Sequence, residues 1–104
     1  MKNEKPMPLF KLGICCVTPG AFAGLTERHI PPSVFFDAHQ YQQFSQELSV
    51  IKVRASFGNC CGPGPITSFF DVGVSILWRL MLELCVETST DRKTTILKLK
   101  SETI

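Results

Sequence analysis

The chain has 104 residues, the size of one ordinary domain. Hydrophobic residues make up 44% of it and charged residues 19%, which is a globular composition and excludes a disordered tail. The formal net charge is only +2 and there are two His, so the composition demands neither a nucleic-acid partner nor an enzyme.

The five cysteines are Cys15, Cys16, Cys60, Cys61 and Cys85. An odd number that includes two adjacent pairs is a poor disulfide framework. We therefore expect reduced thiols in a cytoplasmic protein, most of them acting as small buried hydrophobes. Cys60 and Cys61 stand in a Gly/Pro-rich loop, which makes them the candidate redox-sensitive thiols.

A cleaved signal peptide and a membrane span are both weighed. Lys2 and Lys5 precede an apolar stretch that ends in an Ala-x-Ala-like triplet, but Lys11 interrupts the stretch and argues against cleavage. The most apolar window, residues 69–86, contains three charged residues, which disfavours a spanning helix. We expect a protein without a membrane partner.

Residues 1–9 are predicted to be a flexible N-terminus and residues 10–104 to be a single domain. Residues 10–17 predict a short strand, with Gly13 as a bulge. Thr18 is a suitable N-cap and Pro19 a suitable first helical residue, so a helix should run to about Arg28. We expect Phe22 and Leu25 on the core face of that helix.

A second helix is predicted to begin after the Ile-Pro-Pro segment at residues 30–32. Four residues form a stripe at helical spacing, with Phe44 on its flank; they are Val34, Ala38, Tyr41 and Leu48. Residues 50–57 then alternate like a half-buried strand, with Ile51, Val53, Ala55 and Phe57 on one side. A loop is predicted over residues 58–65, half of which are Gly or Pro.

Residues 68–86 allow two structures. Ser68 and Asp71 could start a long apolar helix, whereas the alternation around residues 72–76 and 80–86 favours strands. Residues 88–93 form a polar turn, and residues 94–100 alternate again as a strand, which together predict a C-terminal β-hairpin.

Two stretches resemble a family of small uncharacterised bacterial proteins of plasmids, prophages and genomic islands. The first is the Phe-Lys-Leu-Gly strand at residues 10–13 and the Thr-Pro-Gly-Ala helix start at residues 18–21, followed by Pro32, Phe36 and His39. The second is the closing hairpin at residues 86–97, with its Asp-Arg turn and Thr-Thr pair. The resemblance implies an intracellular α+β protein with a C-terminal antiparallel sheet, in which residues 72–86 are strands.

Several chemical sites are considered and disfavoured. The five cysteines with His29 and His39 include enough ligand types for zinc, but no metal-ligand spacing is present. Cys60, His39 and Asp91 supply the residue types of a catalytic triad, but composition does not establish that their side chains meet. We predict no catalytic, metal or cofactor-binding residue and no cofactor.

Two binding sites for phosphate groups are also considered. An anion could bind at the Thr-Pro-Gly helix start, but a plain helix cap is favoured there. A modest basic surface could form from residues of the strands and the hairpin, namely Lys52, Arg54, Arg92, Lys93, Lys98 and Lys100. Nearby glutamates favour a solvated face instead.

The fold expected is α+β, with two short N-terminal helices packed on a small antiparallel sheet. The candidate interface consists of Phe69, Phe70, Trp78, Arg92 and Lys93, because a domain with eight Phe cannot easily enclose every aromatic side chain. We predict a non-enzymatic protein-binding accessory factor of a bacterial mobile element that binds a protein partner or forms a homodimer. The sharper hypothesis is an inhibitor of a host defence nuclease complex; the alternative is a nucleic-acid-binding regulatory protein.

Overall fold

The computed structural model describes residues 9–42, 51–58, 64–74 and 77–102. Side chains at residues 51–52, 74 and 77–81 are not part of this description. In chain order the elements are β1 (Ile14–Val17), α1 (Pro19–Glu27), α2 (Ser33–Tyr41), β2 (Ile51–Phe57), β3 (Ile66–Val74), β4 (Leu77–Thr88) and β5 (Thr94–Leu99).

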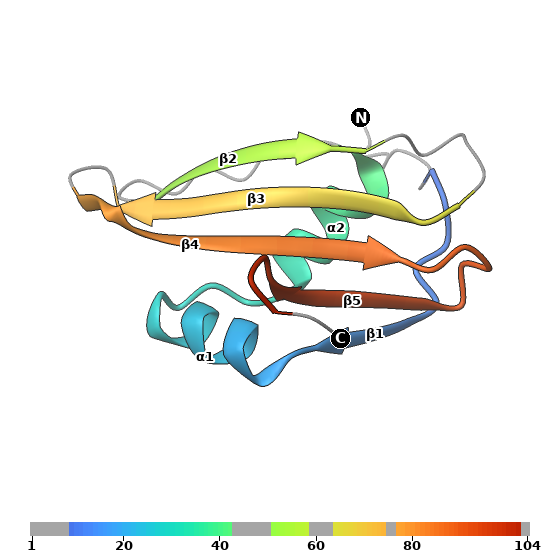
Figure 1. Ribbon diagram of the computed structural model, residues 1–104, viewed down its shortest axis with the longest axis horizontal. Coiled ribbons are helices and arrows are strands. Elements are labelled where there is room, and N and C mark those ends of the chain that lie inside the picture. Colours follow the sequence, from blue (N-terminus) through green and yellow to red (C-terminus); the bar gives the residue numbers. More distant parts are fainter. Residues whose placement is uncertain (1–8, 43–50, 59–63, 75–76, 103–104) are drawn as a thin grey trace, which may run out of the picture.

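The five strands form one sheet in the order β1-β5-β4-β3-β2 (Figure 1). Strands β2 to β5 are antiparallel neighbours, whereas β1 runs parallel to β5 with Cys16 beside Ile96. The α+β class is confirmed. The sheet is mixed instead of wholly antiparallel, because β1 enters beside β5 in the same direction and α1 then carries the chain away from that edge.

The described part of the uncertain segment, residues 72–74 and 77–86, is strand and belongs to the end of β3 and most of β4. Strand pairing holds it there, since Phe70 lies opposite Leu84 and Val72 opposite Leu82. The predicted C-terminal hairpin is also confirmed, with β4 and β5 antiparallel and Val86 opposite Leu97. Long apolar runs of this kind become strands when neighbouring strands satisfy their backbone groups.

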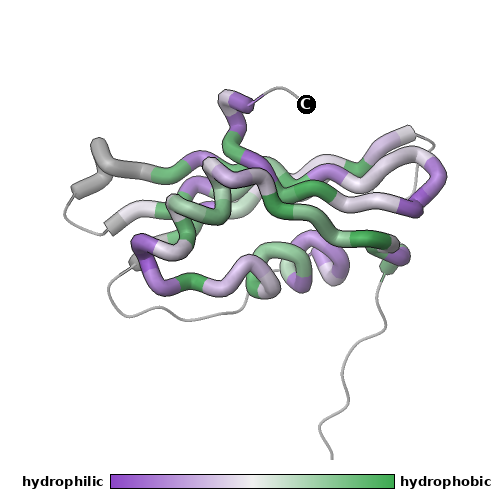
Figure 2. Tube along the Cα trace, turned by 90° about the horizontal axis from the view of Figure 1, so that it is seen from below, coloured by the Kyte–Doolittle hydropathy of each residue, from purple (hydrophilic) through white to green (hydrophobic). Residues whose placement is uncertain are grey.

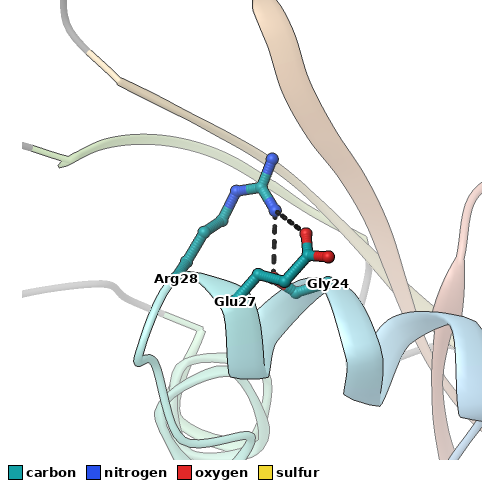
Figure 3. Close-up of polar contacts among 3 residues, drawn as sticks. All are labelled: Gly24, Glu27 and Arg28. Carbon is teal, nitrogen blue, oxygen red and sulfur yellow. Dashed lines mark hydrogen bonds and ion pairs between the residues drawn. The ribbon is translucent and has the colours of Figure 1, made fainter.

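Helix α1 begins as predicted. The Thr18 hydroxyl accepts a hydrogen bond from the Ala21 N–H at 3.3 Å, and Pro19 takes the first turn. At the other end the Arg28 guanidinium donates to the Gly24 carbonyl at 3.0 Å and lies 3.9 Å from the Glu27 carboxylate (Figure 3). These contacts satisfy backbone groups that both helix ends leave open.

The predicted core face of α1 is wrong at Phe22, whose side chain is 55% exposed. Ala21 and Leu25 are fully buried, and Gly24 lies against Leu82 of the sheet. Because most of this short helix is apolar, its pattern cannot select one face, and the tight approach at Gly24 does.

Helix α2 ends at Tyr41, where Gln42 adopts a left-handed conformation with φ 56°. Its buried residues are Phe35, Phe36, Ala38 and His39. The predicted stripe is confirmed at Ala38, which is buried, and at Val34, which packs against the core. Tyr41 is only partly buried, and the stripe left out Phe35, Phe36 and His39. The predicted continuation through Phe44 and Leu48 lies outside the described residues.

The core lies between the helices and one face of the sheet, and both helices pack on this same face (Figure 2). Phe35 of α2 meets Phe70 of β3 edge-to-face at 5.1 Å, and Phe57 of β2 meets the same ring at 5.7 Å. Strand β2 alternates as predicted, with Val53 and Ala55 toward the core. We call the other side of the sheet the open face, because no described element covers it.

Candidate functional site: the open face of the sheet

The open face carries a diagonal apolar band across four strands. Register places Cys16 beside Ile96, and Cys85 beside Phe69. Ile96 and Cys85 are diagonal neighbours, because Ile96 lies opposite Glu87, two residues further along β4. We call Cys16, Ile96, Cys85 and Phe69 the open-face band. The Phe69 ring is 39% exposed, a large apolar surface on an uncovered face.

Two lysines fold over this band. Lys98 lies opposite Cys85, and its ammonium is 3.7 Å from the Glu87 carboxylate, so this ion pair crosses the line from Ile96 to Cys85. Lys100 places its ammonium 5.5 Å from the centre of the Phe69 ring. Burial raises the pKa of the Cys85 thiol, which lies beneath these charges. The two lysines therefore cover apolar surface of the band, with one ammonium paired to a carboxylate and the other over an aromatic ring.

A depression of about 200 Å³ lies beside Ile96 of the band. Its lining residues come from β4, β5 and the turn between them; they are Glu87, Ser89, Thr94, Ile96 and Lys98. Ile14 of β1, opposite Thr94 in the register, stands beside the depression with 69% of its surface exposed. The open face thus combines apolar side chains with charged side chains of both signs.

The predicted interface residues separate in the structure. Phe69 is exposed on the open face, but Phe70 is fully buried, so its predicted exposure is wrong. Adjacent residues of a strand point to opposite faces, and Phe70 packs in the core. Trp78 belongs to β4, but its side chain lies outside the described part of the structure.

Arg92 and Lys93 lie in the turn between β4 and β5, at the end of the sheet. Arg92 has a left-handed backbone with φ 61°, and its guanidinium donates to the carbonyls of Gly64, Ser89 and Thr90. Lys93 is exposed. Arg92 therefore holds the turn against the segment before β3, and Lys93 is the more available of the two.

The thiols of β1 are exposed, so the expectation that most cysteines are buried is wrong for Cys15 and Cys16. Cys85 is buried as expected. Alternation along β1 directs Cys16 to the open face and Cys15 to the helix side, so the adjacent pair cannot chelate one ion. No group of three or more potential ligands lies together among the described residues. Cys60 and Cys61 lie outside them.

A buried polar chain that sequence reasoning missed runs through His39. The ring Nδ1 lies 2.6 Å from the Ser68 hydroxyl, and Nε2 lies 2.9 Å from that of Thr88. The chain continues from Thr88 to Thr95 at 2.7 Å, and Thr95 donates to the Leu12 carbonyl at 2.7 Å. These side chains link α2 to β3, β4, β5 and the segment before β1.

The hydrogen positions along this chain follow from its last bond. Thr95 donates its only hydroxyl hydrogen to the Leu12 carbonyl, so its oxygen accepts a hydrogen bond from the Thr88 hydroxyl. The Thr88 oxygen in turn accepts from the Nε2–H of His39. In a neutral ring Nδ1 is then free to accept from the Ser68 hydroxyl. Burial lowers the pKa of His39 to about 4, which keeps the ring neutral at pH 7.

The contact between Ser68 and His39 resembles a nucleophile beside a base, but both side chains are fully buried. A substrate carbonyl cannot reach the Ser68 oxygen in this arrangement. His39 is also committed to this chain instead of to Asp91, which accepts from the Ser89 hydroxyl and the Lys93 N–H. The buried chain therefore holds the fold together.

The candidate phosphate site at the start of α1 holds a protein carboxylate instead. The Thr18 hydroxyl donates to Glu102 Oε1 at 2.6 Å, and the Leu99 N–H donates to the same oxygen at 2.8 Å. These bonds lower the pKa of the Glu102 carboxyl. An acidic group is favourable at a helix N-terminus, and it repels a phosphate there.

The candidate basic surface is divided. Arg54 and Lys98 lie on the open face, but Lys98 pairs with Glu87, and Asp71 and Glu83 are cross-strand neighbours on the same face. The Lys52 side chain lies outside the described residues. Charges of both signs alternate here, unlike the uniform positive field of a nucleic-acid-binding surface.

The described helices are all too short to cross a membrane. Comparison of the chain with protein-family models, curated proteins and solved structures gave no match.

Proposed function

We propose that this chain is a non-enzymatic protein-binding protein whose binding surface is the open-face band. The observation that carries the proposal is the exposed ring of Phe69 on a face that no described element covers, next to the buried Cys85 and in line with the partly buried Ile96. Aromatic side chains at the centre of a patch, surrounded by polar groups, supply most of the energy of protein association.

The charges around the band define the chemistry of the partner. The Lys100 ammonium stands over the Phe69 ring, so a partner that covers the ring must displace it. A carboxylate next to an apolar side chain would compensate for both changes at once. We infer a partner protein that presents an apolar side chain to Phe69 and an Asp or Glu to Lys100.

A peptide library displayed on phage, selected against the immobilised chain, tests this inference. We expect the enriched peptides to combine an aromatic or aliphatic residue with a nearby Asp or Glu. The synthetic consensus peptide should bind at least tenfold more weakly to Phe69→Ser and severalfold more weakly to Lys100→Gln.

Phe22→Ser is the matched control, because Phe22 is an exposed phenylalanine on α1, away from the open face. Its affinity for the peptide should equal that of the unmodified chain. Failure to enrich any peptide, or equal losses in Phe22→Ser and Phe69→Ser, would contradict the proposal. Salt-dependent retention on immobilised DNA that Lys98→Glu abolishes would replace it with the nucleic-acid-binding alternative.

The finer proposal is that the chain is an accessory factor of a bacterial mobile element and that its partner is a host defence nuclease complex. The resemblance of residues 10–21 and 86–97 to the mobile-element family supports this step. Expression of the chain should raise the frequency of plasmid transfer into a restricting host, measured as transconjugants per recipient. Phe69→Ser should return transfer to its baseline, and unchanged transfer with the unmodified chain would contradict this step.

A further inference from the structure

We propose that β1 is a docking edge for a second copy of this chain, and that two β1 strands pair antiparallel around a two-fold axis at Cys16. The paired strands join two sheets into one. This inference is independent of the partner proposed for the open-face band.

The backbone of β1 has one used edge and one free edge among the described residues. The Ile14 N–H donates to the Lys93 carbonyl at 2.8 Å, and the Thr18 N–H donates to the Leu97 carbonyl at 3.0 Å. In a parallel ladder the even-numbered residues of β1 therefore face β5. The N–H and C=O groups of Cys15 and Val17 consequently point away from the sheet.

Apart from its short length of four residues, this edge lacks the features that usually protect an edge strand. The sequence Ile14-Cys15-Cys16-Val17 contains no charge and no proline, and its first side chain is 69% exposed. Charged residues, prolines or a covering segment normally prevent sheets from pairing edge to edge. Leu9 hydrogen-bonds to Gln40 of α2, so the described chain before β1 approaches from the helix side and leaves this edge open.

A second copy matches the free groups of this edge. With the axis at Cys16, Cys15 of each copy pairs with Val17 of the other, and each such pair exchanges two N–H···O bonds. Ile14 then lies opposite Thr18 and diagonal to Cys16 of the other copy, which covers its exposed side chain. The partner is therefore argued from the complementarity of this strand with itself.

Two other registers would form less complete backbone hydrogen bonding along this edge. An axis at Cys15 would need Gly13 in the ladder, but Gly13 has φ +70° and leaves the strand conformation. An axis at Val17 would place Pro19 opposite Cys15, and proline has no N–H to donate. Cys16 is therefore the favoured centre.

This register brings the two Cys16 side chains together on the open face. Directly opposite residues that do not share hydrogen bonds have Cα atoms about 4.5 Å apart, within the range that a disulfide spans. The two copies also present their open faces on the same side, so the joined sheet carries two open-face bands side by side.

Molar mass in solution under reducing conditions gives the first test. The unmodified chain should have twice its 11.6 kDa mass, and Cys15→Pro should have the single mass with an unchanged circular dichroism spectrum. Proline at this position removes an outward N–H without touching the β5 ladder. Phe69→Ser should remain a dimer, which separates this inference from the proposed function. A monomeric unmodified chain, or a folded Cys15→Pro dimer, would overturn it.

Cross-linking tests the register even if Cys15→Pro does not fold. Two chains are compared, one that keeps only Cys16 and one that keeps only Cys15, with the other cysteines changed to serine or, at Cys85, to alanine. Diamide is the oxidant: two thiols form one disulfide and pass two electrons and two protons to the azo group, which becomes a hydrazine.

Each cross-linking rate is divided by the rate at which iodoacetamide alkylates the same thiol, because partial burial raises the pKa of Cys15. The Cys16 chain should form covalent dimer at least tenfold faster after this correction. Equal corrected rates, or a faster Cys15 chain, would overturn the register.

Discussion

The His39 imidazole and the Ser68 hydroxyl meet 2.6 Å apart inside the core, 29 residues apart in sequence, with neither side chain exposed. This bond joins α2 to β3, and the other ring nitrogen joins α2 to Thr88 of β4. The orientation of the second helix on the sheet therefore depends on a neutral imidazole.

The stability of the fold should fall as the pH is lowered from 7 to 5. The pKa of His39 is lowered to about 4 in the folded chain, against an ordinary value of 6.5. The unfolded chain therefore binds a proton in this window and the folded chain does not, which favours unfolding as the pH falls. The free energy of unfolding, measured with urea, should decrease by about 2 kcal/mol.

The control for this pH dependence is the second histidine. His29→Gln should keep the decrease, whereas His39→Gln, which does not titrate between pH 5 and 7, should lose most of it. The pKa values of the Asp91 and Glu102 carboxyls are lowered, so the effect of these two groups on stability lies below the range of pH 5 to 7. An unchanged slope in His39→Gln would show that another group is responsible.

Ser68→Ala should destabilise the fold by about 1–3 kcal/mol, because it leaves Nδ1 of His39 buried without a donor. Ser56→Ala is the matched control, since Ser56 is exposed on the open face of the neighbouring strand. Urea unfolding of both variants at pH 7 provides the measurement. Equal midpoints would mean that the buried bond contributes nothing.

Phe69 and Phe70 should differ strongly in their contribution to stability. Phe70→Ala removes a fully buried ring that contacts Phe35 and Phe57, and it should cost about 3–5 kcal/mol. Phe69→Ala removes a ring on the open face and should cost less than about 1 kcal/mol. Thermal unfolding distinguishes the two, and the reverse order would mean that β3 has the opposite face toward the helices.

Thr18→Val should destabilise the fold by about 1 kcal/mol, because Thr18 caps α1 and donates to Glu102 near the end of the chain. Thr26→Val makes the same substitution at an exposed position of the same helix and controls for helix propensity. A decrease of roughly 4–8 °C in Tm is expected for Thr18→Val alone. Similar decreases in both variants would leave no role for the cap.

Gly13→Ala should be more damaging than Gly64→Ala. Both glycines have positive φ, which costs an alanine about 1–3 kcal/mol. A Cβ at Gly13 would also collide with the Lys93 backbone, whereas nothing lies within 4 Å of a Cβ at Gly64. Urea midpoints of the two variants separate strain from collision, and equal costs would contradict the close approach of β1 to the turn.

Local chemistry accounts for the parts of the fold that were predicted. Thr18 and Pro19 specify where α1 begins, because capping and a missing N–H act within a few residues. The alternation of β2 and β5 is likewise visible in the sequence, since one face of each strand is buried. Sequence reasoning also placed Phe69 in the candidate interface.

The errors arise where more than one side of an element is apolar. Phe22 and Leu25 could each have faced the core, and only the sheet surface under Gly24 decides between them. Phe69 and Phe70 are chemically identical, and the pairing of β3 with β4 determines which ring is buried. The chain of hydroxyls around His39 has no sequence signal, because its members come from four separate elements.

The sequence by itself determined a small α+β chain of low net charge, the cap of its first helix and the alternation of its clearest strands. Tertiary structure alone decided that residues 72–74 and 77–86 are strands, that β1 lies parallel to β5 at an edge, and that no described element covers one face of the sheet. The physical reason is that burial and backbone pairing depend on which distant segments meet. Propensity and capping, in contrast, act between neighbours in the chain.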